Sequence, residues 1–412
     1  MTNQESELRF EGFKKESYRN GHIGQFGTFY YGKGAPKSSV SVDGKTPVVR
    51  YGELYSTYDG LIEKVLSNTT VDKENLKLSN GGEVLIPRVG ERPLDFCLAS
   101  YLPLKNVAIG EMISVYNTNE NGQYFTYYIR GKLKNTFARL VEGGNVSNLY
   151  FRYLSEVKIN LPSLPEQEKI ADFLSTVDKK IQALTKKKDL LESYKKGVMQ
   201  KIFNQEIRFK KEGGSDYPEW EEDRIESRID YLSGYAFKGA NITEDSSGIP
   251  LMRGVNITEG IVRHSDDLDK YYDANVDGLE KYEVKIGDIV IGMDGSKVGR
   301  NSARITYVDE GALLVQRVAR LREISGTNLE FIYHHINSIS FHRYVDRVKT
   351  SSGIPHISSK QIKDFKIGFP CIEEQAKIAS FLTSIDNKIN VVTSQIDKMK
   401  EWKKGLLQQM FV

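Results

Sequence analysis

The chain has 412 residues, too many for one compact core, and its length suggests two or three domains of ordinary size. Its hydrophobic fraction of 39% and charged fraction of 27% are typical of a globular protein. No stretch approaches the roughly 18 consecutive apolar residues that a membrane span needs. The net charge of +3 is too small to indicate a nucleic-acid-binding protein by itself.

The N-terminus and the cysteines restrict the cellular setting. Residues 1–10 are polar and contain no apolar signal core, so we expect no export, no membrane partner and a cytoplasmic location. The only cysteines, Cys97 and Cys371, lie in different halves of the chain. This excludes a cysteine-rich zinc cluster and argues against a disulfide framework.

Residues 27–34 have the glycine spacing and the lysine of a phosphate-binding loop. Such a loop needs Ser or Thr after the lysine to ligate magnesium, but Gly34 stands there. Three bulky aromatic side chains, Phe29, Tyr30 and Tyr31, would also crowd the phosphates. We therefore expect no nucleotide binding here. Further along, the β-rich run 82–86 predicts a strand bounded by turns.

A long amphipathic helix is predicted from Pro165 to Phe203. Apolar residues recur at alternating steps of three and four, which gives a heptad stripe. Pro165 suits the first helical turn, and Glu166 and Glu168 complement the positive end of the helix. About 38 helical residues would span about 57 Å. A generic coiled coil is the ordinary interpretation of such a stripe.

The same helix occurs twice. Residues 162–203 match residues 370–411 without a gap at an offset of 208, with 18 identities in 42 positions. The lead-in Glu7-Leu8-Arg9-Phe10 is nearly repeated as Glu206-Ile207-Arg208-Phe209. The order is therefore lead-in, domain, helix, then the same again. Gly197 and Gly405 cost about 1 kcal/mol each inside the helices. A close approach, either to the other helix or to a partner, would explain them, and so would fraying near the helix end.

The second domain resembles the first only locally. Residues 287–292 and 311–318 predict buried or half-buried strands, and residues 329–344 predict a helix. His334, His335 and His342 could share a face of that helix as metal ligands. Because no Asp, Glu or Cys stands at matching spacing, we interpret them as ordinary surface or core histidines and expect no metal site.

Motifs for catalysis are absent. An amino-methyltransferase needs Asn/Asp-Pro-Pro-aromatic, and no two of the 11 prolines are adjacent. Glu156-Val157-Lys158 and Glu283-Val284-Lys285 match the end of a nuclease motif, but no Pro-Asp precedes either of them. We expect no catalytic residues and no cofactor bound by this chain.

The predicted fold is α+β, with two mixed α/β domains separated by two long antiparallel coiled-coil helices. The first domain covers 1–161, the central helix 162–210, the second domain 211–369 and the C-terminal helix 370–412. The two helices can bury each other's stripes, and tandem domains related by a two-fold axis require them to run antiparallel.

With these features the chain resembles the specificity subunits of type I restriction-modification systems. The resemblance rests on both helices and on short segments of the domains. These segments are Tyr217-Pro218-Glu219-Trp220-Glu221, residues 232–238, Gly287-Asp288-Ile289, and the endings 157–162 and 365–370. It covers essentially the whole chain. The opening tryptophan is missing from the first domain, where residues 13–17 read Phe-Lys-Lys-Glu-Ser.

The resemblance implies two target-recognition domains, each reading one half of a split, asymmetric site on double-stranded DNA. The helices would set the spacing and dock two methyltransferase subunits, which use S-adenosylmethionine. Restriction subunits, which translocate DNA with ATP and magnesium, would join them. Adenine methylation would need base flipping into the partner's pocket.

Candidate DNA contacts are basic or amide side chains in loops and strands, because Arg reads guanine and Asn or Gln reads adenine. They are Lys33, Lys37, Arg50, Arg88 and Arg139 in the first domain, and Lys238, Arg253, Asn256, Lys297, Arg300, Arg347 and Lys349 in the second. Any one of them is more often a solvated or phosphate-touching group than a base reader.

Two other functions fit the same pattern. A coiled-coil adaptor without DNA binding would use the domains to bind proteins, and its affinity would lack the steep salt dependence of a DNA reader. A recognition subunit of a related restriction enzyme with different partner stoichiometry is the third hypothesis.

Overall fold

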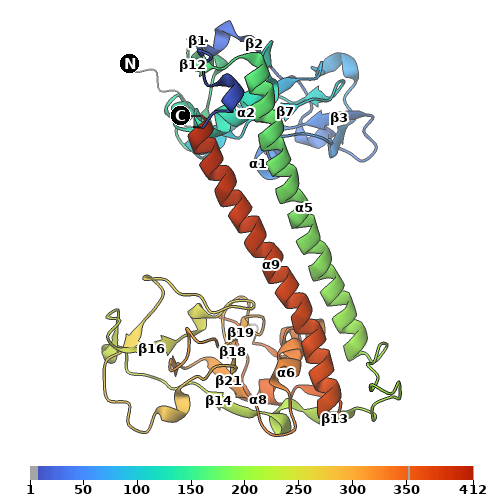
Figure 1. Cartoon of the computed structure of the whole chain (residues 1–412), viewed down its shortest axis with the longest axis vertical. Helices are drawn as coiled ribbons and strands as arrows, with labels where there is room; N and C mark the ends of the chain where they lie inside the picture. The colour runs from blue at the N-terminus through green and yellow to red at the C-terminus, as the bar shows by residue number, and fades with distance from the viewer. Residues whose placement is uncertain (1–7, 351–352, 412) are drawn as a thin grey trace. The chain divides into compact units, whose positions relative to one another are not determined.

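The computed structural model of the chain describes residues 8–350 and 353–411, and Figure 1 follows them from blue to red. The start of the first lead-in, Glu7, lies outside these residues. Contacts divide the chain into two compact units, Met1–Thr185 with Ser394–Val412 and Lys186–Thr393. Each unit mixes helices and sheets, so the predicted α+β class with two mixed domains is confirmed. Within the described ranges, no helix is long and apolar enough to cross a membrane.

The first unit is built on an antiparallel four-stranded sheet in the order β2-β9-β5-β7. Its strands are β2 (Gly27–Tyr31), β9 (Ile113–Thr118), β5 (Glu83–Pro87) and β7 (Ser100–Leu102). A second sheet consists of β4 (Ser67–Thr69), β3 (Thr46–Val49) and β8 (Ala108–Ile109), with β3 and β8 parallel. Small sheets pair β1 (Arg19–His22) with β12 (Lys158–Leu161), and β10 (Glu142–Gly143), β11 (Ser147–Asn148) and β6 (Val89–Gly90). The short helices are α1 (Tyr51–Ser56), α2 (Gly122–Gly131), α3 (Lys134–Arg139) and α4 (Phe151–Ser155).

The second unit repeats this plan. Its four-stranded sheet has the order β14 (Asp230–Ser233), β21 (Val318–Arg322), β18 (Ile289–Gly292) and β19 (Ser302–Arg304). A second sheet contains β15 (Ile242–Thr243), β17 (Tyr271–Tyr272), β16 (Ile249–Met252) and β20 (Leu313–Leu314), with β16 and β20 parallel. β13 (Glu221–Arg224) pairs with β22 (Lys366–Phe369). The short helices are α6 (Leu329–Ile336), α7 (Ile339–Val348) and α8 (Ser359–Lys363). The globular domains of the two units therefore share one fold, although their sequences match only locally.

The two long helices are α5 (Leu164–Phe203) and α9 (Ile372–Met410), as predicted from the repeat. In the first unit, Ile170 and Leu174 of α5 share a core with Leu406 and Met410 of α9. In the second unit, the roles are exchanged: Met199 and Ile202 of α5 share a core with residues 378–385 of α9. The heptad positions are therefore buried because each helix start packs beside the other helix's end within a unit.

An equivalent ion pair joins the two long helices in each unit. Lys403 bonds Asp178 at 2.5 Å in the first unit, and Lys195 bonds Asp386 at 2.6 Å in the second. Both lysines and both aspartates differ by the repeat offset of 208. The structure thus explains why these polar residues are identical in the two copies.

The repeated lead-in is explained by buried carboxylates at the start of each long helix. Arg9 bonds the fully buried Glu166 at 2.6 Å, and Arg208 bonds the fully buried Glu374 at 2.8 Å. A buried carboxylate needs such a partner, because removing its charge from water is costly. Each lead-in arginine therefore holds the preceding chain against the helix of its own unit.

Two predicted elements are corrected by the structure. The run 311–318 is not one strand, because β20 ends at Leu314 and Arg317 turns the chain with a φ of 70° before β21. The helix predicted for 329–344 is two helices, because the Ser338 hydroxyl accepts a hydrogen bond from the Phe341 backbone N–H and starts α7. Hydrophobic periodicity continues across both breaks, so it could not reveal them.

Candidate nucleic-acid interface

Three chain segments meet in the same way in both units. In the first unit, the Gly32 backbone N–H donates to Ile113 O at 3.1 Å and the Lys33 N–H to Ile109 O at 2.9 Å. The Gly110 N–H donates to Val49 O at 2.9 Å. We call this arrangement of segments 32–33, 49–50 and 109–113 the junction of the first unit.

The junction of the second unit is formed by segments 234–235, 252–253 and 314–318. The Gly234 N–H donates to Val318 O at 2.9 Å, and the Tyr235 N–H donates to Leu314 O at 2.8 Å. The Val315 N–H donates to Met252 O at 3.0 Å. All three bonds match those of the first unit, so the two junctions place equivalent residues at equivalent points.

A glycine is required at one corner of each junction. A Cβ on Gly32 would lie 2.1 Å from Gly110 O, and a Cβ on Gly234 would lie 2.1 Å from Val315 O. No side chain fits at that distance from a backbone oxygen. The glycine spacing of residues 27–34 therefore reflects a strand, β2, and a tight backbone crossing, not a phosphate-binding loop.

Each junction carries an arginine directly after a strand. Arg50 follows β3 with φ −107° and ψ 153°, and Arg253 follows β16 with φ −105° and ψ 155°. Among the described residues, neither guanidinium has a carboxylate partner, and Arg253 Nη1 donates only to Leu268 O at 3.2 Å. Both predicted DNA contacts therefore occupy the same place in the fold, and both carry an uncompensated positive charge.

The turn that closes each junction has a non-glycine residue with a left-handed backbone. Met112 has a φ of 63°, and Arg317 has a φ of 70°. The Arg88 backbone N–H donates to Met112 O at 3.0 Å, just as the Met293 N–H donates to Arg317 O at 2.9 Å. Both units share this hydrogen bond, but its two residues are swapped: arginine donates to methionine in the first unit, and methionine donates to arginine in the second. Arg88 itself lies over the Tyr31 ring at 4.5 Å, with Nη2 3.0 Å from Met112 Sδ.

The remaining predicted contacts of the first unit are outward-facing. Lys33, Lys37 and Arg139 are exposed, and among the residues described none of the three forms an ion pair. In the second unit, Lys238 and Arg347 are exposed and unpaired in the same sense. Such cations can neutralise phosphates without first breaking a contact within the protein.

Three other predicted contacts of the second unit are engaged in ion pairs. Lys297 lies 3.0 Å from Glu259, and Arg300 and Lys349 both bond Asp346, at 2.5 and 2.8 Å. Hydrogen bonds from Arg300 and Lys349 hold the pKa of Asp346 well below its usual range. Arg300 therefore anchors the segment after β18 to α7, whereas the bond from Lys349 lies within the end of α7 itself. Contacting DNA would require both cations to leave or share Asp346.

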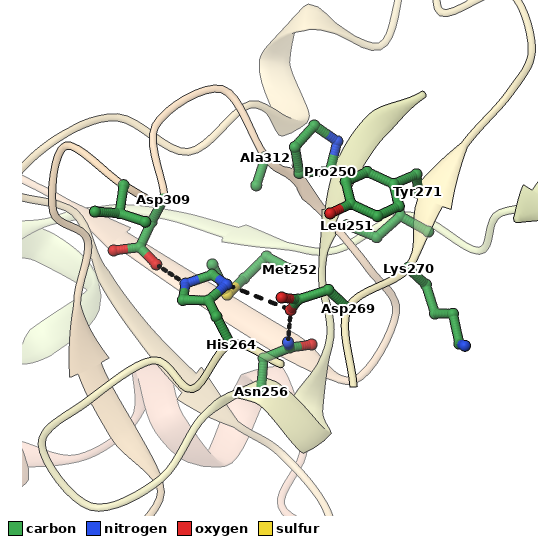
Figure 2. Close-up of a pocket in the computed structure, with 11 residues that line it drawn as sticks. Pro250, Leu251, Met252, Asn256, His264, Asp269, Lys270, Tyr271, Asp309 and Ala312 are labelled. Carbon is green, nitrogen blue, oxygen red and sulfur yellow. Dashed lines mark hydrogen bonds and ion pairs between the residues drawn. The ribbon is translucent and has the colours of Figure 1, made fainter. Parts of the chain in front are cut away.

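Asn256 points into the protein. It lines a pocket of about 310 Å³, and Figure 2 shows it beside Asp269 there. Its side-chain amide donates to Asp269 at 2.9 Å and to Arg263 O at 3.2 Å. Its exposed fraction is only 2%. His264 lies in the same pocket between Asp269 and Asp309, at 3.3 and 3.0 Å. In this conformation Asn256 supports the loop after β16 instead of facing a nucleic acid.

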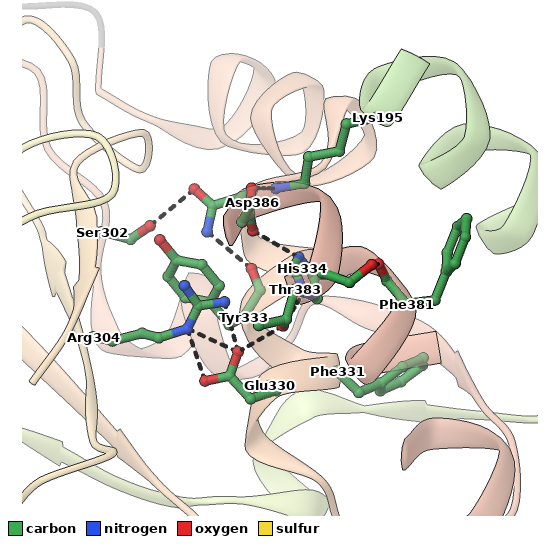
Figure 3. Close-up of polar contacts among 12 residues, drawn as sticks. Lys195, Ser302, Arg304, Glu330, Phe331, Tyr333, His334, Phe381, Thr383 and Asp386 are labelled. Atoms are coloured by element: carbon green, nitrogen blue, oxygen red, sulfur yellow. Dashed lines mark hydrogen bonds and ion pairs between the residues drawn. The ribbon is translucent and has the colours of Figure 1, made fainter. Parts of the chain in front are cut away.

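Two of the three clustered histidines belong to the core of the second unit, and the third is half-buried. His334 and His335 lie in α6 and are buried, whereas His342 lies in α7. His334 Nε2 lies 3.1 Å from Thr383 Oγ1. Figure 3 shows both within a network that includes Glu330, Arg304 and Asp386. Among the described residues, no group of three or more His, Cys, Asp or Glu side chains could hold a metal ion.

Two junction residues, Gln316 and Arg317, are not among the DNA contacts predicted from the sequence. Both are exposed, and within the described ranges Arg317 has no ion pair and no side-chain hydrogen bond. They were hidden because the run 311–318 was interpreted as a single strand. Aligning residues 108–113 with residues 313–318 as strand-turn-strand units would have revealed them.

Comparisons with known proteins agree with this architecture. The family model described as "Type I restriction modification DNA specificity domain" matches residues 15–193 and 217–401. The chain is 25% identical to the type I restriction enzyme MjaVIII specificity subunit of Methanocaldococcus jannaschii, over 96% of this chain and 95% of that one. It is also 32% identical to the EcoAI specificity subunit of Escherichia coli, over 44% of this chain and 31% of that one.

A solved structure of a type I restriction-modification S subunit from M. genitalium has the same fold. It superposes with a TM-score of 0.64, at 15% identity, and covers 99% of both chains. A chain from a structure on assembly and conformational transition of the type I R-M system has a TM-score of 0.56, at 15% identity, over 96% and 98% of the two chains. At these identities the likeness concerns the fold.

Proposed function

Because the chain belongs to the family defined by the type I restriction-modification DNA specificity domain, we propose that each unit reads one half of a bipartite, asymmetric target on double-stranded DNA. The chain is then the specificity subunit of the complex and directs its partners to that site. The observation that carries the proposal is the repeated junction: one backbone frame, present in both units, bears different exposed side chains. The family match favours this function over a coiled-coil adaptor without DNA binding.

We further propose that the long helices act as an antiparallel coiled coil that spaces the two globular domains and docks two methyltransferase subunits. Exposed residues near the end of each helix support docking, because they are shared by both copies although burial does not require it. They are Lys196, Gly197 and Gln200 in α5, and Lys404 and Gln408 in α9, where the matching Gly405 is half-buried. One turn earlier, both helices expose an aromatic ring, Tyr194 (55% exposed) and Trp402 (47%). Two matching surfaces fit two copies of one partner.

The chemistry belongs to the partners in this proposal. Methyltransferase subunits would use S-adenosylmethionine, and restriction subunits would use ATP and magnesium, all in the cytoplasm. This chain would supply sequence recognition and no catalytic group, consistent with the lack of a methyltransferase or nuclease motif.

Mapping of methylated adenines tests the proposal. Cells that carry the methyltransferase of this system are sequenced with and without the chain. With the chain, we expect methylation at one discrete sequence in two parts separated by an unread spacer. Methylation that is independent of the chain, or a continuous target without a spacer, would contradict the proposal.

A further inference from the structure

The two junctions separate side chains that the units share from those that differ. This comparison rests on the proposed function. Both half-sites present the same sugar-phosphate backbone but different bases, and phosphate contacts position a protein whereas base contacts specify the sequence. A residue that is constant at one point of the frame suits the backbone, and one that varies suits the bases.

We propose that Gln316 and Arg317 read bases for the second unit and that Arg253 contacts a phosphate. The corresponding residues of the first unit are Glu111 and Met112 at the varying points and Arg50 at the constant one. In the first unit, Met112 takes the place of Arg317, and the arginine is Arg88, whose backbone N–H donates to Met112 O. The two units therefore place different chemistry on one frame.

The turn of the second unit is rigidly held. The Gln316 N–H donates to Tyr235 O at 2.8 Å, Arg317 O accepts from the Met293 N–H at 2.9 Å, and the Val318 N–H donates to Val315 O at 3.1 Å. Val318 is fully buried behind the turn. Side chains on such an anchored turn lose little further backbone freedom on binding, which favours precise contacts.

The backbone of Arg317 is the kind that glycine normally adopts. A φ of 70° is uncommon for a residue with a side chain, and such conformations cluster at functional sites. Met112 adopts the same conformation at the equivalent point, so the hydrogen-bonded frame of the turn holds it in both units. Within the described residues, the guanidinium of Arg317 has no ion pair, which leaves it available to an external partner.

The chemistry of the pair matches base edges. A guanidinium donates two parallel hydrogen bonds to O6 and N7 of guanine, and the amide of glutamine pairs with N6 and N7 of adenine. Both side chains are exposed on the turn. By contrast, Arg253 is half-buried, with one nitrogen bonded to Leu268 O, which leaves the remaining donors for a phosphate oxygen.

The test compares methylation motifs of single variants within the intact complex. Arg317→Gly suits the left-handed backbone, so it removes the side chain without straining the fold. Arg317→Gly and Gln316→Ala should each relax one base position in one half of the motif, by about 5- to 160-fold in discrimination. Arg253→Ala should leave the motif unchanged, weaken methylation at all sites alike, and lower the salt slope of binding by about 1.

The matched control is Met112→Gly, at the same point of the first unit, which should leave the half read by the second unit unchanged. Unaltered motifs in both Arg317→Gly and Gln316→Ala would overturn the base-reading assignment. A motif altered by Arg253→Ala would overturn the phosphate assignment. If the unmodified chain directs no bipartite methylation, the proposed function itself fails, so the two failures are distinguishable.

Discussion

At the scale of single residues, α6 and α2 show how one framework accepts different side chains. His334 and His335 in α6 correspond to Tyr127 and Tyr128 in α2, counted from the capping residues Asn328 and Asn121. His335 stacks on Phe203 with the ring centroids 3.6 Å apart, and its Nε2 is buried without a partner among the residues described. Burial lowers the pKa of His335 to about 3.

This lowered pKa makes stability depend on pH. Below the unfolded value of about 6.5, the unfolded chain binds a proton that the folded unit excludes, so stability falls as the pH falls from about 6.5 toward 3. Between pH 7 and pH 5, this site should cost about 2 kcal/mol. We expect His335→Phe, which keeps the ring, to remove this contribution in urea unfolding followed by tryptophan fluorescence. The control Tyr128→Phe should keep the full dependence, and equal pH dependence in His335→Phe and the unmodified chain would contradict the prediction.

At the scale of elements, glycines play opposite roles in the junctions and in the long helices. Gly234 is needed because the Val315 carbonyl lies where a Cβ would go. Gly197 and Gly405 have no atom within 4 Å of an added Cβ, other than their own helix. Among the described residues, the hypothesis of a close approach to the other helix is therefore wrong, and docking of a partner is the use that we propose for them.

Alanine substitutions should separate these roles. Gly234→Ala should destabilise the second unit, because backbone at 2.1 Å cannot move aside as a flexible side chain could. Gly197→Ala should stabilise the chain by up to about 1 kcal/mol, since alanine favours a helix over glycine. Thermal unfolding of the two variants measures both effects. Similar shifts in the same direction would show that the junction is not as tightly packed as the distances indicate.

At the scale of the whole molecule, a net charge of only +3 conceals many uncompensated cations on the two units. Among the described residues, eight predicted contacts have no carboxylate partner: Lys33, Lys37, Arg50, Arg88, Arg139, Lys238, Arg253 and Arg347. Elsewhere many basic side chains are paired within the protein, as Arg304 is with Glu330. DNA binding therefore depends on these local positive charges and not on the net charge of the whole chain.

The affinity for DNA should therefore fall steeply with salt. Each phosphate contact releases counterions and contributes about −0.9 to the slope of log K against log salt. Removing Arg50 and Arg253 together should make the slope shallower by about 2. Fluorescence anisotropy at several salt concentrations measures it. Lys180→Ala with Lys388→Ala, which removes the same charge from exposed positions of the long helices, should leave the slope unchanged, and a salt-independent affinity would favour the protein-binding adaptor.

Sequence alone was sufficient for the features that depend on local pattern: two long helices, a cyclic repeat, two mixed domains and the lack of catalytic motifs. Apolar spacing along a helix is a property of neighbouring residues, so α5 and α9 could be predicted to within a few residues. Only the tertiary structure revealed the junctions, because hydrogen bonds between segments far apart in the chain define them. For the same reason, neither the pairing of Arg300 with Asp346, 46 residues away, nor the equivalence of Arg50 and Arg253 could be predicted from spacing.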